Sequence, residues 1–186
     1  MDLGKTLYVT DRKDWRSWLR KNHTKEKVIW LIYFKKSSGK PRIPYNDAVE
    51  EALCFGWIDS TIKAVDDERY AQRFTPRSPK SMLSEMNKER IRRLIKNKKM
   101  TAAGLKAVSH AFDKDKAEKF IIAPDILKAL KADKQAWKNF QDFSEGYKRV
   151  RIGYIEHSRE RGDIFQNRLD NFIRMTKKNK RFGMVQ

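Results

Sequence analysis

The 186-residue sequence has only one cysteine, eight glycines and no long apolar run. Because Cys54 stands alone, the chain can form neither an intrachain disulfide nor a multi-cysteine metal site. The few glycines form no phosphate-binding loop of the G-x-G-x-x-G kind, and the three histidines are far apart without cysteine partners. We therefore expect neither a metal nor a cofactor. No segment reaches the apolar length of a signal peptide or of a membrane span, which predicts a cytoplasmic protein without a membrane-spanning helix.

Positive charge is the strongest feature of the composition. The chain carries 43 Lys and Arg against 24 Asp and Glu, a net charge of +19 with an isoelectric point near 10.0. Such an excess attracts polyanions, although a lysine-rich surface that only keeps a protein soluble has the same composition. Five Trp, ten Phe and six Tyr supply enough large apolar side chains for a folded core, so the sequence does not describe a chain that is disordered throughout.

The order of the periodic segments predicts an α+β protein. The run VIWLIYF (28–34) is β-branched or aromatic throughout, which indicates a central strand. A helix over residues 46–55 should end at Gly56 in a left-handed conformation. Two strand-like runs then flank the acidic triplet DDE, a pattern typical of a hairpin. We expect a small, mostly antiparallel sheet with helices, forming a first domain over residues 1–112.

Only helical signals follow the lysine-rich segment KDKAEK (114–119), which is the most linker-like part of the chain. Pro124 is placed to begin a helix. The last helix carries an apolar stripe at helical spacing. The stripe consists of Ile164, Phe165, Leu169, Phe172 and Ile173. The sequence therefore predicts a second, helical domain over residues 120–182.

The hairpin contains the candidate binding site. A register in which Val65 pairs with Arg69 places Asp59 opposite Thr75, with Arg73 on the same face and the large apolar residues on the other. Such a group is either an anion cradle whose arginines are held by the carboxylate, or an ordinary cross-strand ion pair on an exposed face. The candidate ligand-binding residues are Asp59, Arg73, Thr75, Arg77, Ser81, Asn87, Trp57 and Lys35.

Two other functions are open alternatives. The basic helix that follows residue 76 suggests weak, sequence-independent binding of nucleic acid, although no recognised nucleic-acid motif is present. An enzyme with Asp59 as general base would require a raised pKa, whereas neighbouring arginines would lower it. The sequence thus favours a function without catalysis and identifies no catalytic residue. The candidate nucleic-acid-binding residues are Lys88, Arg92, Arg93 and Lys96.

Several blocks of the sequence are familiar. EALCFGWIDS, RFTPRSPKS, RLIKNKKMTAAGL and the C-terminal run over residues 136–173 resemble the YdeI/OmpD-associated, bacteriocin-protection family, and the resemblance covers nearly the whole chain. It implies a soluble bacterial protein linked by name to envelope stress or porin association, with no established catalytic mechanism. We expect a binding module with an anion-favouring polar pocket, whose partner is a small anion or an acidic protein surface. The sequence carries no signal for an oligomeric state.

Overall fold

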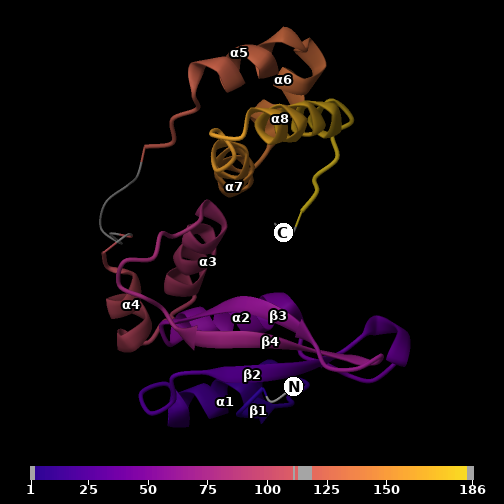
Figure 1. The fold of residues 1–186 in the computed structure, drawn as a ribbon. Coiled ribbons are helices and arrows are strands. Elements are labelled where there is room, and N and C mark those ends of the chain that lie inside the picture. The colour runs from indigo at the N-terminus through magenta and orange to yellow at the C-terminus, as the bar shows by residue number, and fades with distance from the viewer. Residues whose placement is uncertain (1–2, 111, 113–118, 184–186) are drawn as a thin grey trace. The chain divides into compact units, whose positions relative to one another are not determined.

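The computed structural model describes residues 3–110, 112 and 119–183 (Figure 1). The chain forms two compact units. The first comprises Met1–Met82 and Arg90–Asp113, and the second comprises Leu83–Glu89 and Lys114–Gln186. Helix α3 (Glu85–Lys96) therefore contributes its first residues to the second unit and the rest to the first. Residues 114–118 of the predicted linker lie outside the described residues.

The first unit is built on a four-stranded sheet with the strand order β1-β2-β4-β3 (Figure 1). Its strands are β1 (Thr6–Leu7), β2 (Ile29–Phe34), β3 (Trp57–Ala64) and β4 (Arg69–Pro76). Only β1 and β2 pair in parallel, and the other two pairs are antiparallel. The α+β class and the mostly antiparallel sheet are thus confirmed, and the apolar run that predicted a central strand is β2.

Helices cover one face of this sheet. The first unit contains α1 (Arg12–Asn22), the short 3-10 helix η1 (Lys36–Ser38), α2 (Tyr45–Cys54) and α4 (Ala102–Val108). Trp15 of α1 is fully buried and meets Phe74 of β4 edge to face, with 5.5 Å between the ring centroids. Its indole N–H donates to the carbonyl of Ala48 in α2. The core of the unit therefore lies between the sheet and α1 and α2.

Three of the sequence blocks meet where α2 ends. The Cys54 carbonyl accepts bonds from both the backbone N–H and the hydroxyl of Thr101, at 3.1 and 2.6 Å. The Thr101 hydroxyl also caps α4 by accepting from the N–H of Gly104. Gly56 follows the helix with a φ of +76°, as predicted, and its carbonyl accepts from the N–H of Arg77. EALCFGWIDS, RFTPRSPKS and MTAAGL are therefore joined by backbone contacts.

The predicted register of the hairpin is wrong at Asp59. At the turn, the N–H of Val65 donates to the carbonyl of Arg69 over 3.0 Å, as predicted. A β-bulge then interrupts β3 between Asp59 and Ile62. Because a bulge places one extra residue in one strand, it shifts every later pair. Asp59 therefore lies opposite Phe74 instead of Thr75.

The second unit is helical. Besides the start of α3 it contains α5 (Pro124–Ala132), α6 (Lys134–Asp142), α7 (Glu145–Glu156) and α8 (Gly162–Lys177), coloured orange to yellow in Figure 1. Pro124 begins α5 as predicted. The side chain of Asp133 caps α6 and that of Ser144 caps α7. A core cluster joins α5–α8, with Phe172 of α8 fully buried in it. No helix in the described part of the chain has the length and apolar character that a membrane crossing requires.

Candidate functional site: an arginine pocket in the helical unit

The structure separates Asp59 from the arginines predicted to surround it. Asp59 lies on the helix-covered face of the sheet, where its carboxylate accepts from the hydroxyl of Tyr45 in α2 over 2.7 Å. Arg73 pairs with Trp30, and both lie on the opposite face. Thr75 shares that opposite face, because side chains alternate along β4. The β-bulge is the cause, since a shift of one residue moves a side chain to the other face.

Two further candidates are part of the packing of the first unit. Trp57 is 1% exposed, and its indole N–H donates to the carbonyl of His23 over 3.1 Å. The buried guanidinium of Arg77 donates to the carbonyl of Met82. Its Nε has no partner within the described residues, and burial lowers its pKa. Neither side chain contributes to the predicted cradle on the hairpin.

Of the last three predicted ligand-binding residues, two lie in the first unit apart from Asp59 and one lies in the second unit. The Ser81 hydroxyl closes a turn by donating to the carbonyl of Ser78 over 2.7 Å. Lys35 is exposed and follows β2 at the end nearest the hairpin turn, whereas Asp59 lies level with the start of β2. Asn87 belongs to the second unit. The eight residues therefore form no single site within either unit.

The basic residues of α3 are largely engaged within the protein. Lys88 forms a 3.0 Å ion pair with Glu85 of the same helix, and Arg93 pairs with the buried Glu50 of α2. The guanidinium of Arg92 lies over the ring of Phe112, 5.4 Å from its centroid. Lys96 is exposed.

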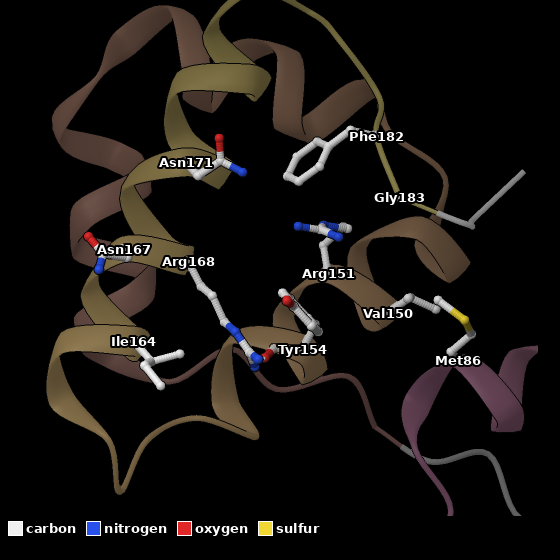
Figure 2. A pocket seen from close by; sticks show the side chains of 10 residues that line it. All are labelled: Met86, Val150, Arg151, Tyr154, Ile164, Asn167, Arg168, Asn171, Phe182 and Gly183. Atoms are coloured by element: carbon white, nitrogen blue, oxygen red, sulfur yellow. The ribbon is translucent and has the colours of Figure 1, made fainter. Parts of the chain in front are cut away.

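A pocket of about 480 Å³ lies in the second unit, between α7 and α8 (Figure 2). It arises because α8 carries two different stripes. One stripe is apolar and supplies Leu169 and Phe172 to the core. The neighbouring stripe follows the spacing i, i+3, i+4, i+7 with mostly polar residues, and it faces the pocket. The pocket is lined by Met86, Val150, Arg151, Tyr154, Ile164, Asn167, Arg168, Asn171, Phe182 and Gly183.

Guanidinium groups and aromatic rings alternate along this pocket, as Figure 2 shows. The guanidinium carbon of Arg151 lies 3.8 Å from the ring centroid of Phe182 and 5.1 Å from that of Tyr154. On the Tyr154 ring the guanidinium of Arg168 lies 3.7 Å from the centroid. Arg168 also donates to the backbone carbonyl of Tyr154 over 2.7 Å. Two positive charges are thus held against one tyrosine.

Arg151 is a buried cation without an anionic partner among the described residues. The residue is 6% exposed, and its Nε finds no acceptor among the residues that the structure describes. Burial lowers the pKa of its guanidinium, and the charge of Arg168 acts in the same direction. A buried carboxylate of the first unit does have charged partners, because Glu51, 3% exposed, is bonded by Arg12 and Arg16 at 2.9 and 2.6 Å.

The other polar groups of the pocket are amides. The Asn171 oxygen accepts from Arg174 over 2.6 Å, which leaves its NH₂ group directed toward the side of the pocket where Phe182 lies (Figure 2). The described residues that line the pocket include no aspartate or glutamate. The lining therefore offers hydrogen-bond donors and positive charge, which complement an anion. Residues 3–110, 112 and 119–183 contain no cluster of His, Cys, Asp and Glu suited to a metal ion.

Sequence reasoning did not single out Arg151 or Arg168. A signal was nevertheless present, because Arg151 follows Tyr147 and Val150 on the apolar side of α7 and breaks its pattern. The polar stripe of α8 was the second signal, but the stronger apolar stripe of the same helix concealed it.

The fold and the pocket describe a two-part protein, an α+β unit with a helical unit that contains a pocket lined by two arginines. The chain belongs to the family defined by a domain of unknown function (DUF8412), whose family model matches residues 7–107, just over half of the sequence. Residues 119–179 match the bacteriocin-protection, YdeI or OmpD-associated family model. Comparison with the curated proteins and with the solved structures gives no significant match.

The two family matches divide the sequence blocks between them. The resemblance to the bacteriocin-protection, YdeI or OmpD-associated family is confirmed in the C-terminal part of the chain. EALCFGWIDS, RFTPRSPKS and RLIKNKKMTAAGL lie within the DUF8412 match instead. The residues that α7 and α8 contribute to the pocket, from Val150 to Asn171, lie within the C-terminal match.

Proposed function

We propose that this protein is a binding module that holds an anion in the pocket of Arg151 and Arg168. The observation that carries the proposal is the Arg151 guanidinium, which is buried without a carboxylate partner in the described structure. Removing a charge from water costs several kcal/mol unless an opposite charge and hydrogen bonds offset the loss. An anion in the pocket would supply both.

A packing role for Arg151 explains the arrangement less well. The rings of Phe182 and Tyr154 offset part of the desolvation cost through cation–π attraction, on the order of 2 kcal/mol at a desolvated site. They supply no negative charge, and Arg168 adds a second positive charge nearby. Arg77 shares an unpartnered Nε, but its guanidinium donates to a backbone carbonyl, whereas that of Arg151 lines a cavity.

The biological role would follow from the family of the C-terminal part. We propose a cytoplasmic protein that contributes to protection against bacteriocin or envelope stress by capturing an anionic molecule. The partner would be a small anion, because the pocket of about 480 Å³ falls within the size range of small-molecule sites. The net charge of +19 would raise the local concentration of such a partner.

Calorimetric titration of the full chain with inorganic sulfate tests the proposal. Arg168→Gln removes one guanidinium from the pocket and should weaken sulfate binding by about 10-fold to 100-fold, the effect of a lost charge-assisted contact. Arg161→Gln makes the same change in charge at an exposed residue outside the pocket lining and should leave the affinity unchanged. Equal affinity in all three proteins would contradict the proposal, since sulfate would then be responding only to net charge.

Arg151→Met separates a binding role from a structural one. Methionine fills a similar volume and packs well against aromatic rings. Without an anion, the variant should gain about 1–3 kcal/mol in free energy of unfolding, because an uncompensated buried charge is removed. It should also lose sulfate binding. Urea denaturation followed by circular dichroism measures the first effect. A variant that is less stable and still binds sulfate would show that Arg151 is a packing residue.

A further inference from the structure

We infer that the pocket of Arg151 and Arg168 takes a carboxylate carried on an apolar body, an inference that rests on the proposed function. The first observation is the size of the cavity. Its volume of about 480 Å³ exceeds what a bare inorganic anion fills. The remaining wall is formed by apolar side chains, which would bury hydrocarbon and gain from doing so. These side chains are Met86, Val150, Ile164 and Phe182.

The charge that needs a partner is a single one. Arg151 is buried, whereas Arg168 is half-buried and already donates to the Tyr154 carbonyl. Solvent therefore screens the Arg168 charge in part, and one negative charge suffices to neutralise the buried guanidinium. A carboxylate supplies one negative charge. A phosphate monoester at neutral pH would bring up to two charges and would have to bury the second.

The geometry of the donors also suits a carboxylate. The ring of Phe182 covers one face of the Arg151 guanidinium at 3.8 Å, so the edge formed by its two terminal NH₂ groups remains for hydrogen bonding. A carboxylate binds such an edge through two parallel bonds. The NH₂ group of Asn171 offers a further donor from α8 (Figure 2), and a carboxylate has lone pairs left to accept from it.

The placement of the side chains orients the occupant. The charged end lies at Arg151, next to Phe182 and Tyr154 (Figure 2). The hydrocarbon end extends past Tyr154 toward Ile164 of α8, which lines the far side of the pocket (Figure 2). Tyr154 is 47% exposed, so the pocket is open to solvent beside it. A small organic acid can thus enter without opening the helical core.

Titrations with four compounds test this assignment on the full chain: acetate, 3-phenylpropionate, phenyl phosphate and inorganic sulfate. We expect 3-phenylpropionate to bind at least about tenfold more tightly than acetate, because it buries a hydrocarbon body. Ile164→Ala should weaken the binding of 3-phenylpropionate by about fivefold to tenfold and leave the affinity for acetate unchanged. Ile121→Ala is the control, since it makes the same change at a side chain that is 78% exposed and outside the pocket lining.

The outcomes separate this inference from the proposed function. Suppose that sulfate binding depends on Arg168, but that 3-phenylpropionate binds no more tightly than acetate or that its affinity is unchanged by Ile164→Ala. The inference of an apolar body is then wrong, whereas the proposed anion site is still supported. If phenyl phosphate binds more tightly than 3-phenylpropionate, and its affinity rises through its second ionisation near pH 6, the occupant is a dianion and the carboxylate is wrong. If none of the four anions responds to Arg168→Gln, the inference and the proposed function fail together.

Discussion

Replacing Gly104 with alanine tests the contact that joins α2 to α4. A Cβ atom at this position would lie 2.2 Å from the carbonyl oxygen of Cys54 and 2.9 Å from that of Leu53. Both contacts are with backbone atoms, which cannot swing aside as a flexible side chain does. Accommodating the methyl group therefore requires α4 to move away from the end of α2, and that movement strains the bonds from Thr101 to the Cys54 carbonyl.

The expected magnitude follows from three terms of different sign. Alanine is a better helix former than glycine by about 1 kcal/mol, which favours the variant. Forcing an extra methyl group into a packed contact costs about 1–3 kcal/mol. Weakening the Thr101 cap, which bonds the N–H of Gly104, costs about 1 kcal/mol more. The variant should therefore lose about 1–3 kcal/mol, the opposite sign to that predicted by helix propensity alone.

Urea denaturation followed by tryptophan fluorescence measures this loss, because four of the five tryptophans, at positions 15, 18, 30 and 57, belong to the first unit. Gly162→Ala is the matched control. Gly162 is the first residue of α8, and a Cβ added there would meet no atom within 4 Å. The free energy of unfolding of the Gly162→Ala variant, measured by circular dichroism, should be unchanged or up to about 1 kcal/mol higher than that of the wild type. A Gly104→Ala protein at least as stable as the wild type would falsify the close contact.

Three further substitutions or reactions test other parts of the first unit. Trp57→Ala should cost about 3–5 kcal/mol in urea denaturation, because the side chain is 1% exposed, and a cost below about 1 kcal/mol would contradict its burial. Lys98 follows α3 with a φ of 53°, so Lys98→Gly should raise thermal stability by up to about 1 kcal/mol, and an unchanged or lower value would argue against backbone strain. Burial raises the pKa of the Cys54 thiol to about 11, so at pH 8 maleimide should react only as urea unfolds the protein, and rapid labelling of the native chain would contradict this.

Local signals predicted much of the first unit. The central strand β2 followed from an unbroken run of β-branched and aromatic residues, and the end of α2 followed from Gly56, whose φ is indeed +76°. The β-bulge in β3 was not predictable in the same way. It depends on where Asp59 finds partners across the sheet, and the hydroxyl of Tyr45 and the amide of Gln72 supply them on the helix-covered face. The alternation of polar and apolar residues along one strand does not indicate these contacts.

The arginine pocket was missed for a related reason. Its alternating rings and guanidinium groups come from α7, α8 and the segment at Phe182, so no window of sequence contains them together. Arginine is also expected at the surface, and a single arginine in an amphipathic helix does not by itself suggest burial. Only the tertiary structure shows that Arg151 is enclosed while its Nε lacks a partner among the described residues.

The residues of the sequence blocks fit their structural surroundings, whereas Arg151 of the pocket does not. Gly56, Gly104 and Thr101 all serve local needs, a left-handed turn, a close helix contact and a cap, so they agree with the fold at every level and need no ligand to explain them. Arg151 conflicts with its surroundings, because the position favours an apolar side chain and the charge has no described counter-ion. Proteins keep such conflicts mainly where function offsets their cost. The proposed binding site therefore lies in the helical unit, whereas Gly56, Gly104 and Thr101 of the first unit serve packing.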